Sequence, residues 1–108
     1  SADPAALATA IIRGAFEYQG QKCSATSRVY IPKSLWPGLK DQLIADIATI
    51  RWGDVSDFTN FMGAVIDGRA WDRLAQARNA ALSGTGGRWL AGDEPDRTNG
   101  YFVPPQLL

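Results

Sequence analysis

Cys23 is the residue of this chain with the clearest capacity for covalent chemistry. It lies in the run Gly20-Gln21-Lys22-Cys23-Ser24-Ala25, between a helix-like and a strand-like stretch, in a chain of 108 residues without histidine. A thiolate is a strong nucleophile, but a free cysteine with an ordinary pKa of about 8.5 is only a few per cent ionised at neutral pH. Lys22 and the backbone amides of the turn can favour the anion, whereas a cysteine–histidine pair cannot form. The proton acceptor must be a carboxylate or a water-mediated base.

A free cysteine is also among the residue types most often buried, where it acts as a small hydrophobic side chain. The flanking residues therefore decide between the two interpretations. They follow the pattern Gly-Gln-x-Cys-x-Ala-x-x-Arg, which begins at Gly20 and ends at Arg28. This pattern resembles the nucleophile segment of the aldehyde dehydrogenase superfamily.

Further stretches extend the resemblance along essentially the whole chain. Within the superfamily, the motifs around Cys23 look most like pyrroline-5-carboxylate dehydrogenase, also called L-glutamate gamma-semialdehyde dehydrogenase. The later stretches match family landmarks in the expected order. These matching stretches are Phe16-Glu17-Tyr18, Lys22-Cys23-Ser24, Ser34-Leu35-Trp36-Pro37, Trp52-Gly53-Asp54, Gly63-Ala64-Val65-Ile66-Asp67 and Gly100-Tyr101-Phe102-Val103-Pro104-Pro105.

Two departures accompany the resemblance. Val55 stands where the family usually has proline, and Gln106 follows Pro105 where a threonine or cysteine is common. The family's full chain is also several times longer. We therefore expect residues 1–108 to be a fragment of the catalytic, nucleophile-bearing domain, without the dinucleotide-binding domain.

The resemblance implies a mechanism in which Cys23 attacks an aldehyde carbon. The backbone amide of Cys23 would help to stabilise the resulting oxyanion, a hydride would pass to NAD, and water would hydrolyse the thioester. The family places the catalytic glutamate, an oxyanion-binding asparagine and the NAD site outside this chain, so Glu17 is not expected to be the base. The isolated chain should bind no NAD and should be inactive.

In the pyrroline-5-carboxylate subfamily, a serine after the nucleophile looks like a ligand for the substrate carboxylate. Ser24 occupies that position and its hydroxyl can donate one hydrogen bond. The alternative is that Ser24 only packs a tight turn. Both interpretations remain open from the sequence.

Composition limits the classes of partner. Eleven basic and eleven acidic residues cancel, so no positive field would recruit nucleic acid or an anionic membrane surface. No apolar run approaches the length needed to span a bilayer. One cysteine and no signal-peptide pattern favour a cytoplasmic setting, or the mitochondrial matrix if the source is eukaryotic. Without histidine, no zinc ligand set is expected.

Apolar periodicity and capping residues predict three helices. The first should run from Pro4 to Tyr18 after an Asp3 cap, the second should follow a Ser34 cap, and the third should follow an Asp67 cap. The second has its apolar face at Leu35, Leu39, Leu43, Ile47 and Ile50, and the third at Trp71, Leu74, Ala75, Arg78, Ala81 and Leu82, before the loop Ser83-Gly84-Thr85-Gly86-Gly87.

Extended stretches are predicted at residues 27–31, 88–91 and 101–103. Strands that alternate with helices indicate an α/β fold with helices packed on a mostly parallel sheet. A piece of such a fold would expose apolar faces and strand edges, so we expect a homo-oligomer through these surfaces if the chain is isolated. The alternatives are another semialdehyde dehydrogenase and a non-enzymatic interaction or redox module that carries a thiol.

Overall fold

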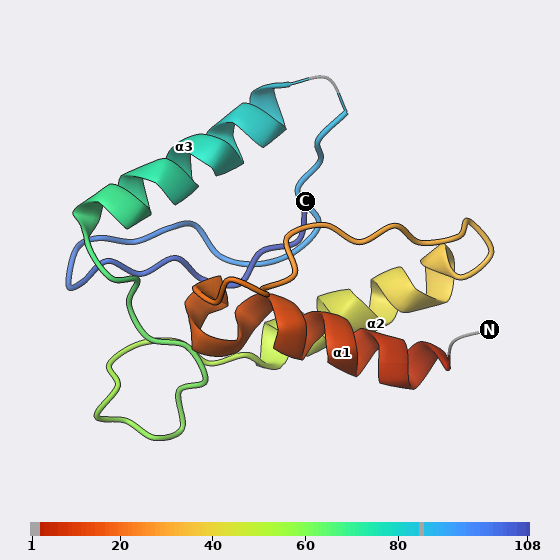
Figure 1. Ribbon diagram of the computed structural model, residues 1–108, viewed down its shortest axis with the longest axis horizontal. Coiled ribbons are helices and arrows are strands. Elements are labelled where there is room, and N and C mark those ends of the chain that lie inside the picture. The colour runs from red at the N-terminus through yellow and green to blue at the C-terminus, as the bar shows by residue number, and fades with distance from the viewer. Residues whose placement is uncertain (1–2, 85) are drawn as a thin grey trace.

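Three α-helices and a short 3-10 helix are the regular elements of the computed structural model, which describes residues 3–84 and 86–108. Thr85, in the loop predicted to end the third helix, lies outside the described residues. Figure 1 shows α1 and α2 side by side and α3 apart from them, with the C-terminal segment running between. The elements are α1 (Pro4–Phe16), η1 (Glu17–Gly20), α2 (Trp36–Thr49) and α3 (Gly68–Ser83).

The start of α1 is as predicted, but its end is not. The carboxylate of Asp3 accepts the backbone N–H of Ala5 at 3.2 Å, and Pro4 occupies the first helical position. The predicted end at Tyr18 is wrong, since α1 ends at Phe16 and η1 follows. Tyr18 has a positive φ of 53°, and this left-handed conformation cannot continue a right-handed helix.

The core lies between α1 and α2. Ala8 of α1 and Leu39 and Leu43 of α2 are buried together, as the predicted apolar face of α2 requires. Complete burial of a leucine side chain contributes roughly 1.5–3 kcal/mol. Partly buried side chains complete this cluster: Leu7, Ile11, Ile12, Ile31, Trp36 and Leu107.

The predicted Ser34 cap is wrong. The residue that precedes α2 is Leu35, and no side chain caps the helix. The carbonyl of Pro32 instead accepts the backbone N–H groups of Leu35 and Trp36, at 3.0 and 3.2 Å. A turn of the backbone therefore satisfies donors that a serine hydroxyl was expected to satisfy.

The prediction for α3 is confirmed. Asp67 caps it, because its carboxylate accepts the backbone N–H of Ala70 at 2.8 Å. The six residues of the predicted face are all half-buried. That face contacts the C-terminal segment, where the Trp71 indole donates to the Phe102 carbonyl at 3.0 Å and Arg97 stacks over Trp71.

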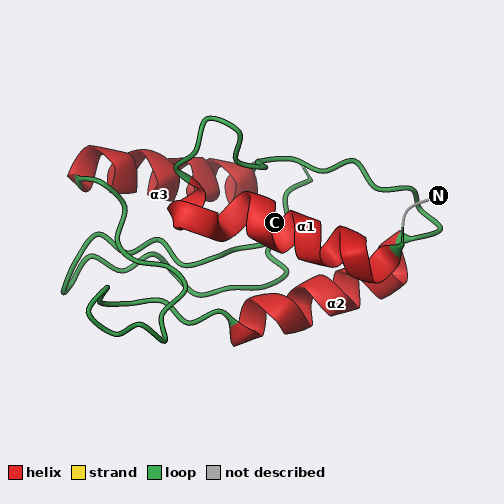
Figure 2. Cartoon of the chain, turned by 60° about the horizontal axis from the view of Figure 1, so that its bottom comes forward, coloured by secondary structure: helices red, strands yellow, loops and turns green. Residues whose placement is uncertain are grey.

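The predicted sheet is not formed among the described residues, and Figure 2 shows helices and loops only. Three isolated bridges take its place: Trp52 with Met62 in parallel, and Ala91 with Leu107 and Asp96 with Phe102 antiparallel. Within the described ranges, the backbone groups of residues 27–31 make no backbone hydrogen bond. A strand is defined by its partner, and residues 27–31 have none here.

Among the described residues, no helix is both long enough and apolar enough to cross a membrane.

Candidate active site

Cys23 lies at the centre of a tight turn that follows α1. The Ala25 N–H donates to the Lys22 carbonyl at 3.0 Å and closes the turn, and the next N–H, of Thr26, donates to the Gly14 carbonyl at 2.9 Å. The second bond ties the turn to the last part of α1, which precedes the turn in the chain (Figure 1). Cys23 and Ser24 are both exposed. The thiol is therefore open to solvent, and the C-terminal side of its turn is hydrogen-bonded to α1.

The close approach of this turn to α1 depends on Gly14. A Cβ at position 14 would lie 2.7 Å from the Thr26 hydroxyl oxygen, closer than van der Waals contact allows. Any larger residue would have to push Thr26 away from the helix. Glycine at this position thus lets the chain after Cys23 lie directly against α1.

A run of left-handed residues leads into the turn. Tyr18, Gln19 and Gly20 have φ values of 53°, 57° and 68°. Each of the two non-glycine residues costs roughly 1–2 kcal/mol in this conformation. The Gln21 N–H donates to the Tyr18 carbonyl at 3.0 Å, which reverses the chain direction. The surrounding contacts must therefore hold this approach to Cys23 in place.

The Glu17 carboxylate pairs with two basic side chains near the turn. One carboxylate oxygen accepts from Lys22 Nζ at 2.9 Å and the other from Arg13 Nε at 2.8 Å. These bonds, that from Lys22 first, lower the pKa of Glu17. The Lys22 ammonium, predicted to favour the thiolate, is thus already paired with a carboxylate. Glu17, with both oxygens occupied, is poorly suited to accept a proton from the thiol or a water.

The backbone N–H of Cys23 has no hydrogen-bond acceptor among the described residues. An unpaired N–H on a turn is a ready donor for an oxyanion. The geometry is therefore compatible with the role expected for this amide. Within residues 3–84 and 86–108, no group of three or more aspartate, glutamate, cysteine or histidine side chains could hold a metal ion.

Sequence reasoning missed the partners of the two glutamines that flank Gly20. Gln21 Oε1 accepts the backbone N–H of Ile66 at 2.9 Å. The Gln19 carboxamide lies against Gly63 and Ala64, and with its oxygen toward Gly63 it accepts that N–H at 3.2 Å. The Gly-Gln pair of the pattern was the available signal, but its partner lies 45 residues away.

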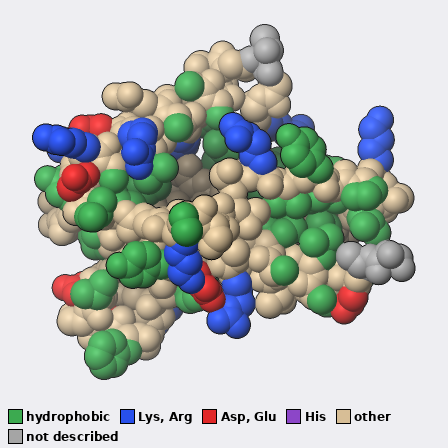
Figure 3. Space-filling view, in the orientation of Figure 1, with side chains coloured by type: hydrophobic (Ala, Val, Ile, Leu, Met, Phe, Trp, Pro, Cys, Tyr) green, Lys and Arg blue, Asp and Glu red, His purple; other side chains and the backbone are tan. Residues whose placement is uncertain are grey.

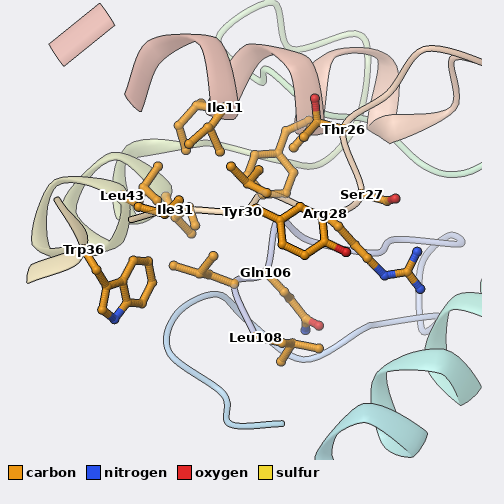
Figure 4. A pocket seen from close by; sticks show the side chains of 16 residues that line it. Ile11, Thr26, Ser27, Arg28, Tyr30, Ile31, Trp36, Leu43, Gln106 and Leu108 are labelled. Atoms are coloured by element: carbon orange, nitrogen blue, oxygen red, sulfur yellow. The ribbon is translucent and has the colours of Figure 1, made fainter. Parts of the chain in front are cut away.

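An apolar hollow of about 490 Å³ lies beside residues 26–31. Hydrophobic side chains gather in this depression on the right of Figure 3, and Figure 4 shows Ile11, Ile31, Leu43 and Trp36 around it. Ile11 comes from α1 and Leu43 from α2, so the hollow opens directly onto the core. Tyr30 lies on its rim and is 92% exposed.

Comparison with known proteins covers the whole chain. The sequence profile described as the aldehyde dehydrogenase family matches residues 1–108. The mitochondrial Delta-1-pyrroline-5-carboxylate dehydrogenase of Homo sapiens is 43% identical over 109 residues, which cover 100% of this chain and 19% of the human protein. That of Dictyostelium discoideum is 41% identical over 97 residues, covering 90% of this chain and 17% of its own length.

Solved structures show the same fold. The Delta-pyrroline-5-carboxylate dehydrogenase of Mycobacterium tuberculosis, in a crystal structure bound with NAD, superposes with a TM-score of 0.93 at 46% identity. The superposition covers 98% of this chain and 20% of the Mycobacterium chain. The chain thus spans about a fifth of the length of the relatives that it matches.

Proposed function

The chain belongs to the aldehyde dehydrogenase family, and we propose that it carries the nucleophile of an enzyme that oxidises L-glutamate gamma-semialdehyde to glutamate in proline degradation. The observation that carries the proposal is the solvent-open thiol of Cys23 on an anchored turn. The names of the human and Mycobacterium relatives support the choice of substrate.

In this mechanism the Cys23 thiolate attacks the aldehyde carbon. A carbon–sulfur bond forms and the carbonyl electron pair moves to oxygen, where the unpaired Cys23 N–H can donate a hydrogen bond. NAD, bound in the longer protein, would be the oxidant: it would accept the hydride from the same carbon as the carbonyl re-forms, which leaves a thioester on Cys23. Water then cleaves the carbon–sulfur bond of the thioester, which releases the carboxylate and restores the thiol.

We assign no NAD contact to the residues of this chain. The described residues include no glycine-rich turn between a strand and a helix, which is the arrangement that binds a dinucleotide phosphate. The proposal is that residues 1–108 belong to the catalytic domain and that the dinucleotide-binding domain and the catalytic glutamate lie in the remaining four-fifths of the relatives' length. The isolated chain should then neither bind NAD nor oxidise an aldehyde.

The rest of the same protein is also the proposed partner of residues 27–31. These residues belong to no helix or strand, lack backbone hydrogen bonds among the described residues, and border the apolar hollow. Pairing with strands of the remaining catalytic domain would complete the mostly parallel sheet and cover the hollow. The isolated chain should self-associate through the same surface, and we expect no nucleic-acid or membrane partner.

Ser24 is the proposed ligand for the substrate carboxylate. It is exposed and adjacent to Cys23, so a bound aldehyde could reach its hydroxyl. A hydrogen bond to a charged group contributes about 1.5–3 kcal/mol. In the longer enzyme, Ser24→Ala should raise KM for glutamate semialdehyde roughly tenfold or more, but leave KM for an uncharged aldehyde almost unchanged.

The control for this experiment is Ser34→Ala, because Ser34 is also exposed but lies at the approach to α2. It should change neither KM. An equal rise in KM for the charged and the uncharged aldehyde would contradict a carboxylate contact and leave Ser24 with a role in the turn alone.

The test of the proposed function is Cys23→Ser in the longer enzyme, assayed by NAD reduction. Loss of the nucleophile should lower kcat by about a thousandfold or more, with NAD affinity retained. Retention of activity would overturn the proposal. A substrate profile of the unmodified enzyme separates glutamate semialdehyde from other semialdehydes.

The mitochondrial names of the human and Dictyostelium relatives favour a matrix location if the source is eukaryotic. We propose a cytoplasmic location otherwise.

A further inference from the structure

The nucleophile turn and the segment that enters α3 are joined by a direct hydrogen bond. Gln21 Oε1 accepts the backbone N–H of Ile66 at 2.9 Å, although 45 residues separate the two. In Figure 1 the end of α1 and the chain entering α3 lie next to each other. Gln21 precedes Cys23 by two residues, so this bond fixes the chain just before the nucleophile.

The segment of residues 63–66 is itself firmly held. The Val65 side chain is only 4% exposed, and its N–H donates to the Tyr101 carbonyl at 2.8 Å. Asp67, the next residue after Ile66, caps α3. The acceptor on Gln21 is therefore bound to a segment anchored both by the C-terminal segment and by a helix start.

A second contact lies beside the first. The Gln19 carboxamide lies against Gly63, where an added Cβ would approach the end of that carboxamide to 3.0 Å and Val55 Cγ1 to 2.7 Å. A side chain at position 63 would therefore have to displace Val55 or the Gln19 carboxamide. Two glutamine side chains from the approach to Cys23 thus meet the same four-residue segment.

The turn needs such support on its N-terminal side. On its C-terminal side it is anchored to α1 by the Thr26 N–H. On its N-terminal side the chain passes through Tyr18 and Gln19 in a left-handed conformation that is costly for both residues. Without an external bond, this stretch could relax and reorient Cys23.

We propose that Gln21 is a positioning residue, whose carboxamide oxygen holds the nucleophile turn against residues 63–66 by accepting the Ile66 N–H. The proposal rests on the proposed role of Cys23 as nucleophile. Gln21 does not touch the substrate in this role. It sets the direction from which the thiol approaches the aldehyde carbon, and misplacement of reacting atoms by about 1 Å can cost about a hundredfold in rate.

The experiment compares two variants of the longer enzyme. Gln21→Met keeps the length of the side chain but removes the acceptor, and should lower kcat by about 10- to 100-fold with KM for the aldehyde changed less than about threefold. Gln21→Glu keeps an acceptor oxygen and should recover most of this loss. The rates are compared at each variant's optimal pH, because an added carboxylate near a thiol disfavours the thiolate.

The matched control is Gln42→Met, which removes an exposed side-chain bond to Asp46 on α2 and should leave kcat unchanged. Hydrogen exchange should be faster at residues 21–25 in Gln21→Met alone. If Gln21→Met does not fold, Gln21→Asn, whose oxygen is one methylene too short to reach Ile66, takes its place.

Unchanged kcat in Gln21→Met, or an equal loss in Gln21→Met and Gln21→Glu, would overturn the positioning role. Cys23→Ser is assayed in parallel. An active Cys23→Ser variant would refute the proposed function itself, whereas an inactive one beside a fully active Gln21→Met would refute only the role of Gln21.

Discussion

The two ends of α1 are stabilised in different ways. Its N-terminal half packs Ala8 against Leu39 and Leu43 of α2, and all three are at most 2% exposed. Its C-terminal end leads into the exposed turn around Cys23, where hydrogen bonds and one ion-pair cluster replace apolar burial. Burial is non-directional and tolerant of small shifts, whereas hydrogen bonds fix orientation. The chain thus couples a stable scaffold to an oriented but exposed thiol.

The largest effect is expected from the buried end. Leu39→Ala should lower the free energy of unfolding by about 2–4 kcal/mol, because it removes a fully buried side chain and leaves a cavity. Urea denaturation of the protein measures the change. Val55→Ala, at a position that is 72% exposed, should change the free energy of unfolding by no more than about 0.5 kcal/mol. Equal shifts in the two variants would mean that the α1–α2 interface is not the main source of stability.

An intermediate effect is expected where α1 meets the chain after Cys23. In Gly14→Ala the new Cβ would clash with the stiff Thr26 side chain at 2.7 Å. Overpacking costs about 1–3 kcal/mol, while replacing a helical glycine gains about 1 kcal/mol. The free energy of unfolding should therefore fall by about 1 kcal/mol, as measured by urea denaturation. In the longer enzyme, kcat should fall as well.

Gly38→Ala is the matched control, since a Cβ at position 38 of α2 meets nothing within 4 Å. This variant should raise the free energy of unfolding by up to about 1 kcal/mol, from helix propensity alone. The double variant Gly14→Ala with Thr26→Ala, which removes the clashing oxygen, should recover part of the loss. Stabilisation by Gly14→Ala as large as that by Gly38→Ala would show that the turn can move away from α1 without cost.

The smallest effect is expected from the exposed charges of the turn. Since folding lowers the pKa of Glu17, through Lys22 first and then Arg13, its contribution to stability is present above the unfolded-state pKa. The contribution is lost as the pH falls through the lower folded-state pKa. Glu17→Gln should therefore lower the melting temperature slightly at neutral pH but not at strongly acid pH.

The matched condition for Glu17 is high salt, which screens exposed pairs and should remove the difference at neutral pH. A difference between Glu17→Gln and the unmodified protein that persists in acid would point to packing rather than charge as its origin.

Sequence patterns predicted the helices better than the sheet. The apolar positions of α2 and α3 face inward as their spacing predicted, because one helix can satisfy its own backbone and needs only an apolar surface to cover one side. A strand cannot satisfy its own backbone. Residues 27–31 and 88–91 have the composition of strands, yet of these two described stretches only the second contributes to a bridge, through Ala91.

The sequence by itself determined the family pattern around Cys23, the Asp3 and Asp67 caps and the apolar faces, all of which depend on residues close together in the chain. Only the tertiary structure decided that Lys22 is paired with Glu17 and that Gln21 binds Ile66. Those contacts depend on where the left-handed run after Phe16 directs the chain. Because a few backbone angles set that direction, no local pattern of residue types encodes it.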